Sequence, residues 1–316
     1  MSLLRIKDLN IVYYTLSGPV KAVVDASLEI EPGEWVSIVG ESGSGKSTLV
    51  YGIMRLIPPP GRIVSGSIIY KDTDLAKLSE KELRRIRGPE IGMIFQDPMT
   101  SLDPLRRIGD QIAEALLEHG IVSDKEEALE RAKKALKEVG IPENRINSYP
   151  HQLSGGQRQR VLIAAAVALQ PKILIADEPT TALDVVVQAK IMDLLEELKR
   201  KYNMTIILIT HDIALAAERS TRIVVMYAGR IVEDGPVDEI VNDPKHPYTE
   251  GLLESTPDLW GEKEIKSIPG NPPDLRNPPP GCPFHPRCPK AMKVCRESFP
   301  AYTRLNKRRV ACHLYK

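Results

Sequence analysis

The sequence predicts an α/β fold with an inserted helical subdomain and a C-terminal appendage rich in proline and cysteine. Residues 172–176 and 205–210 are continuous apolar runs, as expected for strands buried on both faces of a parallel sheet. The helical pattern of residues 187–201 lies between these runs, which makes a β-α-β crossover. From about residue 97 to 169 the periodicity is helical, whereas residues 269–289 hold nine of the 26 prolines and exclude a helix or a central strand.

The other elements follow from local patterns. A helical pattern over residues 48–56 comes directly after a glycine-rich loop, which itself follows a strand. Inside the helical block, residues 125–139 predict a strongly amphipathic helix with Ser123 and Asp124 as capping residues. Predicted strands cover residues 4–14, 21–30, 35–39, 66–70, 90–95, 223–226 and 230–233.

Length, charge and hydropathy limit the kinds of protein that this chain can be. The 316 residues suffice for one large domain and an appendage, and the net charge of +1 argues against a nucleic-acid partner for the whole chain. Residues 276–316 nevertheless carry a charge of +9, which leaves −8 for the rest. The longest apolar run has nine residues, where a membrane helix needs about 20. The first residues do not form a signal peptide, so we expect a cytoplasmic protein that reaches a membrane only through a partner.

The glycine-rich loop predicts a phosphate-binding site. Residues 40–47 fit the pattern G-x-x-x-x-G-K-[ST] without gaps. The glycines let backbone N–H groups surround the β- and γ-phosphates, Lys46 adds a positive charge, and the Ser47 hydroxyl is suited to ligate Mg²⁺. The helix that follows points its positive end at the same phosphates. The predicted phosphate-binding residues are Gly40, Ser42, Gly43, Ser44, Gly45, Lys46, Ser47 and Thr48.

Two acids end the apolar strand over residues 173–176. Burying two carboxylates is costly unless a cation is present, which predicts that Asp177 holds Mg²⁺ through water. Glu178 then has the position of the general base that polarises an attacking water. The alternative is a capped strand end with two solvated acids.

A third motif, Leu153-Ser154-Gly155-Gly156-Gln157, opens a helix that Ser154 can cap. Its chemistry alone predicts only an anion site. With the phosphate loop before it and the acidic strand after it, the chain resembles the nucleotide-binding subunit of an ABC transporter over nearly its whole length. The resemblance implies a P-loop NTPase fold of the ABC-ATPase type, with a RecA-like core and an antiparallel β subdomain. The ATPase domain is expected over residues 1–255, with its helical subdomain at about 97–169, and the tail over 256–316.

The same resemblance implies roles for single residues. Ser154 and Gly156 contact the γ-phosphate of ATP held by a second ABC ATPase subunit, in a homodimer or a paralogous heterodimer. His211 is the switch histidine, and Gln96 lies near Mg²⁺ and the attacking water. Asp184 belongs to a loop that crosses the dimer interface. The aromatic residue that stacks on adenine is expected to be Tyr13, with Tyr14, on the opposite strand face, as the alternative.

Three features narrow the resemblance to the peptide branch of ABC importers. They are the string Pro244-Lys245-His246-Pro247-Tyr248-Thr249, the Cys-Pro and Pro-Arg-Cys-Pro strings of the tail at residues 282–289, and Phe95-Gln96-Asp97-Pro98-Met99-Thr100-Ser101-Leu102. Such a subunit drives import of dipeptides or oligopeptides on the inner face of the cell membrane. Its partners are two transmembrane permease subunits and, indirectly, an extracellular substrate-binding protein. Oligosaccharide is the alternative cargo. Non-transport ABC ATPases are the other alternative, but they carry a long coiled-coil insertion, two cassettes in tandem, or a shorter chain without such a tail.

All four cysteines lie in the last 35 residues, spaced C-x5-C-x6-C-x16-C. This spacing is neither the usual zinc pair nor the ferredoxin run, so the residues alone leave zinc, an iron–sulfur cluster, disulfides and free thiols open. The resemblance implies a 4Fe–4S cluster, with zinc as the alternative, on Cys282, Cys288, Cys295 and Cys312. Metal binding would then supply the folding energy of the tail, so loss of a cysteine is expected to disorder the tail and to leave ATP binding intact.

Overall fold

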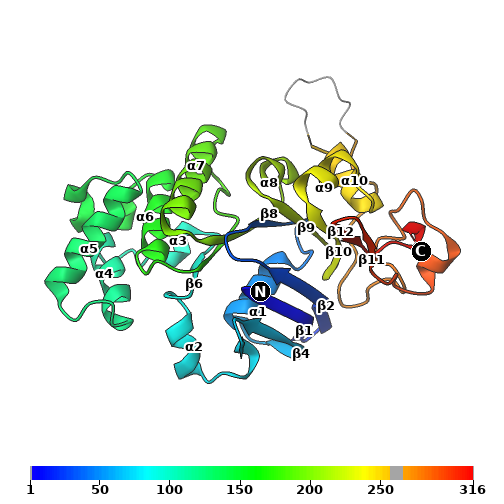
Figure 1. Ribbon diagram of the computed structural model, residues 1–316, viewed down its shortest axis with the longest axis horizontal. Coiled ribbons are helices and arrows are strands. Elements are labelled where there is room, and N and C mark those ends of the chain that lie inside the picture. Colours follow the sequence, from blue (N-terminus) through cyan, green and yellow to red (C-terminus); the bar gives the residue numbers. More distant parts are fainter. Residues whose placement is uncertain (1, 257–265, 316) are drawn as a thin grey trace. The chain divides into compact units, whose positions relative to one another are not determined.

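The computed structural model describes residues 2–256 and 266–315 and divides into two compact units. The first unit combines the N-terminal segment Met1–Lys77 with the C-terminal segment Leu208–Lys316. The second unit is the segment between them, Leu78–Ile207. Helices and strands of both units are labelled in Figure 1.

An antiparallel sheet of the first unit has the strand order β2-β1-β4-β5. Alternate residues of the long strands are buried, for example Leu4 and Ile6, because one face of this sheet packs on the core. Register shifts near Leu9 and Ile11 bend the pairing of β1 with β2 and β4. The bounds are β1 (Leu4–Thr15), β2 (Gly18–Ile30), β4 (Gly61–Tyr70) and β5 (Thr73–Asp74).

A second set of strands in the first unit has the order β11-β12-β10-β9-β3. All five residues of β3 are buried, and β3 runs parallel to β9. β12 pairs antiparallel with β10 through Glu233 and Val310, so the C-terminal segment extends this set by two strands. The bounds are β3 (Trp35–Val39), β9 (Arg222–Tyr227), β10 (Arg230–Pro236), β11 (Thr303–Leu305) and β12 (Arg308–Val310).

The helices of the first unit are mostly short. Tyr227, Tyr248 and Phe284 form an aromatic cluster with ring centroids 4.6–5.3 Å apart, and Cys282 and Cys295 belong to the same buried core. The bounds are α1 (Lys46–Met54), η1 (Leu75–Lys77), α8 (Ile213–Arg219), α9 (Val237–Asn242), α10 (Pro247–Glu254), η4 (Lys293–Arg296) and η5 (His313–Tyr315).

The second unit is mainly helical and contains a parallel strand pair, β6 (Ile91–Ile94) and β7 (Ile173–Asp177). α5 begins after Asp124, whose carboxylate accepts hydrogen bonds from two backbone N–H groups, and it packs against α4 and α6. β8 (Thr205–Thr210) carries the chain into the first unit. The helices are α2 (Glu80–Ile86), α3 (Pro98–Ser101), α4 (Ile108–Glu118), α5 (Lys125–Glu138), η2 (Glu143–Asn147), η3 (Pro150–Gln152), α6 (Gly155–Val167) and α7 (Val185–Tyr202).

The predicted α/β fold and its helical block are confirmed. The observed bounds of helices and strands differ from the predicted ones by a few residues. The largest difference is at β4, which begins at Gly61 and not at residue 66. The sequence predicted no strand in the tail, but β11 and β12 join a sheet. The division at residues 255 and 256 stays a prediction.

Candidate active site

The phosphate loop lies between β3 and α1 in the first unit, as predicted. Gly45 takes φ +101° and is the N-cap of α1, so no side chain caps the first N–H groups of this helix. A Cβ atom at Gly45 would lie 2.2 Å from the carbonyl oxygen of Ala22, which only glycine avoids. The helix start therefore presents backbone donors to an anion, over Ser47 and Thr48.

Lys46 is nearly buried and holds the loop in its bent conformation. Its Nζ donates hydrogen bonds to the carbonyl oxygens of Gly40, at 2.8 Å, and Glu41, at 3.0 Å. The Ser44 hydroxyl is also buried and has no hydrogen-bond partner among the described residues. The loop is thus preformed around a positive charge, which favours binding of a phosphate group.

Glu41, the second residue of the loop, is tied to the C-terminal part of the chain. Its backbone N–H donates to the Tyr248 hydroxyl at 2.7 Å, and its carboxylate accepts two hydrogen bonds from Arg287. Sequence analysis missed these contacts. Tyr248 stands in the string of residues 244–249 and Arg287 stands next to Cys288 in the tail, but nothing in either segment pointed to the phosphate loop.

The acidic end of β7 forms the second part of the candidate site, within the second unit. Asp177 is fully buried at the strand end, where a carboxylate suits a hard cation such as Mg²⁺. Glu178 follows in the left-handed region, with φ +43°. Its Oε2 accepts hydrogen bonds from Gln96 Nε2, at 3.1 Å, and from Thr181 Oγ1, at 2.9 Å.

These contacts bring together Gln96 and Glu178, which the resemblance had placed near the attacking water. Thr181 is an addition that sequence analysis did not single out for this role. Two donors on one carboxylate oxygen fix the orientation of the Glu178 side chain.

The other predicted site residues of the second unit lie at helix starts. Ser154 caps α6 and forms a capping box with Gln157, as its sequence position predicted. Gly156 faces α7, because a Cβ atom there would lie 2.8 Å from a Val187 methyl group. Asp184 caps α7 through the backbone N–H of Val187, at 2.9 Å.

Tyr13 and His211 lie in the first unit. The half-buried Tyr13 ring packs over Gly61 of β4, while the side chain of Tyr14 is 55% exposed. His211 is exposed directly after β8. The phosphate loop, Tyr13 and His211 thus belong to one unit, and Gln96, Ser154, Gly156, Asp177, Glu178 and Asp184 to the other.

Comparison with known proteins agrees with a preformed phosphate loop and an acidic strand end that carries an oriented glutamate. Residues 23–181 match the family described as "ABC transporter", and residues 232–295 match the "Oligopeptide/dipeptide transporter, C-terminal region". The chain belongs to the ABC transporter family. It is an ABC-type ATPase of the dipeptide/oligopeptide branch, which confirms the resemblance seen in its motifs.

Curated relatives of this ABC ATPase match nearly end to end. It is 54% identical to the oligopeptide transport ATP-binding protein OppD of Bacillus subtilis, over 94% of this chain and 84% of the relative. It is 49% identical to the dipeptide transport ATP-binding protein DppD of Haemophilus influenzae, over 99% and 96%.

Solved structures agree with this assignment. The dimeric post-hydrolysis structure of the ATP-binding cassette MJ0796 with ADP and Pi superposes with a TM-score of 0.67 and 34% identity, over 74% of this chain and 98% of that one. The structure of cbiO1 from Clostridium perfringens has a TM-score of 0.65 and 31% identity, over 77% of this chain and 91% of that one.

The four cysteines of the ABC ATPase are free thiols that line one cavity, together with His246, Phe284 and His313. Burial raises the pKa of Cys282 to about 11 and also raises the pKa values of Cys288 and Cys312. In the described part of the chain, no three His, Cys, Asp or Glu side chains form a group that could hold a metal ion. The four cysteines therefore fit a metal centre in two respects only: thiols are suitable ligands, and all four line the same cavity.

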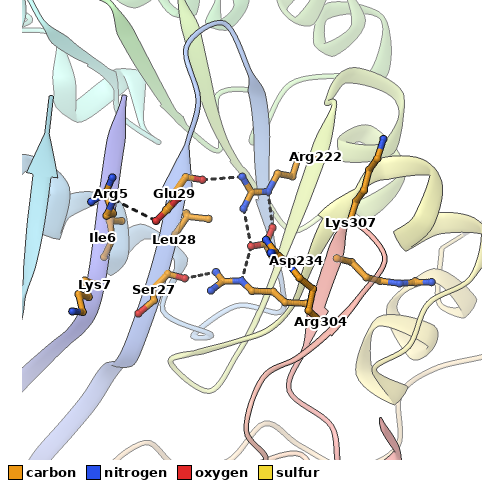
Figure 2. Close-up of a pocket in the computed structure, with 12 residues that line it drawn as sticks. Arg5, Ile6, Lys7, Ser27, Leu28, Glu29, Arg222, Asp234, Arg304 and Lys307 are labelled. Atoms are coloured by element: carbon orange, nitrogen blue, oxygen red, sulfur yellow. Dashed lines mark hydrogen bonds and ion pairs between the residues drawn. The ribbon is translucent and has the colours of Figure 1, made fainter. Parts of the chain in front are cut away.

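A basic pocket lies where the C-terminal hairpin β11–β12 meets β1 and β2 (Figure 2). Arg222 and Arg309 converge on Asp234, which is 2% exposed, with N–O distances of 2.7 and 2.8 Å. Arg309 also donates to the carbonyl oxygen of Ser27. The pocket shares no residue with the phosphate loop, and the contacts of Arg309 hold the C-terminal hairpin to β10 and β2.

Proposed function

We propose that this ABC ATPase powers the import of dipeptides or oligopeptides through a membrane transporter. The observation that carries the proposal is the match of residues 232–295 to the C-terminal region of oligopeptide/dipeptide transporters. Relatives named as oligopeptide and dipeptide transport ATP-binding proteins support it over nearly the whole chain.

The proposed assembly is a dimer of ATP-binding subunits attached to two transmembrane permease subunits on the cytoplasmic face of the membrane. A dimeric cassette among the structural relatives supports the subunit pairing. Among the described residues, none of the helices has the length and apolar character to cross a membrane. The permease subunits therefore provide the membrane attachment in this proposal.

In the proposed reaction the phosphate loop binds the triphosphate, Tyr13 stacks on adenine, and Ser154, Gly156 and Asp184 face the ATP of the second subunit. Glu178 accepts a proton from the water that attacks the γ-phosphorus, the bond from this phosphorus to the β–γ bridging oxygen breaks, and ADP and phosphate are released. Gln96 and Thr181 orient Glu178 by donating to its Oε2. His211 contacts the γ-phosphate. Ser47, Asp177 and Gln96 are the residues that would hold Mg²⁺, which would neutralise charge on the phosphates.

Uptake of labelled peptides by cells tests this function. Cells without the chain should lose uptake of di- and tripeptides, and the intact chain should restore it. Lys46→Ala should not, because the variant binds nucleotide weakly. Unchanged peptide uptake together with lost oligosaccharide uptake would contradict peptide cargo and support the alternative.

We also propose that Cys282, Cys288, Cys295 and Cys312 hold a 4Fe–4S cluster. Four thiols that line one cavity offer the ligand type that a cluster needs. The test is visible absorption together with the iron and zinc content of protein purified without oxygen. About four irons per chain and a brown colour support the cluster, whereas one zinc in colourless protein contradicts it.

A further inference from the structure

The ion pair between Arg287 and Glu41 joins the cysteine-bearing tail to the phosphate loop. Arg287 donates one hydrogen bond to each carboxylate oxygen of Glu41, at 2.6 and 2.9 Å. The Arg287 side chain is 5% exposed and that of Glu41 is 26% exposed, so water screens this pair only weakly. Two parallel hydrogen bonds fix direction as well as distance, which a single contact does not.

Both partners of this pair are held from further sides. Arg287 Nε donates to the carbonyl oxygen of Pro269 at 2.8 Å, and its Nη1 reaches the Tyr227 hydroxyl at 3.3 Å. The Glu41 N–H donates to Tyr248, and the Glu41 carbonyl oxygen accepts from Lys46. Glu41 is thus fixed at its N–H, its carbonyl and its carboxylate, and two of these three contacts come from residues beyond position 240.

The proline-rich part of the tail also touches the loop. Pro272 and Pro273 line a small pocket together with Glu41 and Ser42. Removal of the tail contacts would therefore free the loop on this side and expose a carboxylate next to bound phosphates.

We propose that Arg287 is a positioning residue for nucleotide binding, which keeps the phosphate loop in shape and neutralises Glu41. Without Arg287 the Glu41 carboxylate is left partly buried, unpaired and close to a highly negative ligand, so it repels the triphosphate. Arg287 touches neither phosphate nor water in this scheme and acts only through Glu41. The tail thereby becomes a determinant of ATP affinity.

The test is a double-mutant cycle on the affinity of the full-length protein for ADP and for Mg-ATP. Arg287→Gln should weaken binding about tenfold, within the range of coupling between sites, and Arg287→Lys should recover part of the loss. Glu41→Gln removes the ion pair with Arg287 and also the negative charge that would repel the nucleotide. Adding Arg287→Gln to this variant should therefore reduce the nucleotide affinity only slightly. Wild-type affinity in Arg287→Gln, or equal losses in both backgrounds, would overturn the proposal.

Matched controls separate positioning from general damage. Arg276→Gln removes a tail arginine that pairs with Asp274 within the tail, and it should leave affinity unchanged. Tyr248→Phe removes one hydrogen bond to the loop and should weaken binding about fivefold. Tyr302→Phe removes a similar bond to the carbonyl of Ile231 and should not. If Arg287→Gln does not fold, Tyr248→Phe and Tyr302→Phe still test whether contacts from the C-terminal segment support nucleotide binding. Equal nucleotide affinities of these two variants would count against the proposal.

Thermodynamic linkage between the nucleotide and the tail provides a further measurement, which would not change if Arg287 had only a structural role. If Arg287 couples the tail to the loop, nucleotide binding must slow hydrogen exchange over residues 282–298 in the wild type and in Arg276→Gln, but not in Arg287→Gln. The inference rests on the assignment of the loop as the ATP site. A wild-type protein that binds no ATP would refute that assignment, whereas equal binding by wild type and Arg287→Gln would refute only the role of Arg287.

Discussion

Glu178 occupies a left-handed backbone conformation that non-glycine residues avoid, with φ +43°. Such a conformation costs on the order of 1–3 kcal/mol, and it is common at functional sites, where neighbouring contacts maintain it. Here Gln96 and Thr181 hold the side chain by one oxygen. The strain and the two donors together aim the carboxylate, which is consistent with a general base.

The proposed role of Glu178 as general base predicts that ATP binding and ATP turnover respond differently to its substitution. Glu178→Gln keeps the shape of the side chain but cannot take a proton, so the turnover rate should fall by about 10²–10⁴ while ATP affinity is retained. The variant should also dimerise in Mg-ATP, because the bound nucleotide is no longer hydrolysed. Steady-state ATPase assays and gel filtration measure both effects. Glu197→Gln, an exposed acid on α7, is the control, and wild-type turnover in Glu178→Gln would remove the residue from this role.

Thr181 should contribute through orientation. Thr181→Val removes one of two hydrogen bonds to Glu178 Oε2, so kcat should fall about fivefold with little change in KM. Thr181→Ser retains the hydroxyl and should restore most of the rate. A change in KM alone would indicate a role in binding.

At this scale the sequence predicted Glu178, Lys46 and the Ser154 cap, because each stands in a motif with fixed spacing, whereas Gln96 followed only from the family resemblance. Thr181 was not predicted for its contact with Glu178, because threonine in a loop carries no signal of a specific partner. The contact requires the turn after β7, whose geometry only the fold defines.

At the scale of elements, the close approach of α6 and α7 explains why residue 156 is a glycine. Sequence analysis assigned this residue only to anion binding. The space for a Cβ atom at Gly156 is 2.8 Å from Val187 Cγ1, whereas at Gly155 the nearest atom, on Leu183, lies at 3.6 Å. The motif therefore also serves the packing of two helices.

This difference predicts opposite effects of two alanine substitutions. Gly155→Ala should leave stability unchanged or raise it slightly, because alanine favours helix. Gly156→Ala should destabilise the protein by roughly 1–3 kcal/mol through overpacking against Val187. Chemical denaturation measures both, and equal free energies of unfolding for the two variants would refute the packing argument.

A buried histidine at the N-terminus of α10 makes the stability of the fold depend on pH. His246 is 1% exposed and accepts the Tyr248 N–H, and burial lowers its pKa from 6.5 to about 3. The unfolded chain binds a proton below pH 6.5 that the folded chain does not take until about pH 3. Stability from this group is therefore full above pH 6.5 and is lost as the pH falls, at up to about 1.4 kcal/mol per pH unit.

The variant His246→Asn keeps an acceptor for the cap and removes the titration. As the pH is lowered from 7 to 4.5, its free energy of unfolding should rise relative to that of the wild type. Urea denaturation measures both values. His151→Asn changes an exposed histidine and should follow the wild type. A constant difference between wild type and His246→Asn at all pH values would contradict the assignment.

At the scale of the whole molecule, the tail is part of the first unit and not an extended appendage. Asp234 pairs with Arg309 across 75 residues, and Glu41 pairs with Arg287 across 246. Periodicity and motifs report on neighbours in sequence, so they predicted the strands, the helical block and the phosphate loop. They could not predict these pairs, because arginine in a basic tail looks the same whether it is solvated or bound.

The tail contacts change the expectation for loss of a cysteine. Cys288→Ser should loosen residues 282–312, as the sequence predicted, because Cys288 lines the cavity that the tail encloses. Since Arg287 is its neighbour, nucleotide affinity should fall as well, by up to about tenfold. Limited proteolysis and nucleotide titration of the same sample measure the two effects. A cleaved tail with unchanged affinity would restore the earlier expectation of independence.

The distance between Glu41 and Arg287 along the chain also has a consequence for protein synthesis. A ribosome that adds about 5–20 residues per second needs roughly 12–50 s to pass from one partner to the other, across 246 residues. During that interval the nascent polypeptide already carries its glycine-rich loop but lacks the arginine that completes it. In the proposed role of Arg287, the affinity for ATP therefore reaches its full value only after residue 287 has been translated and has paired with Glu41.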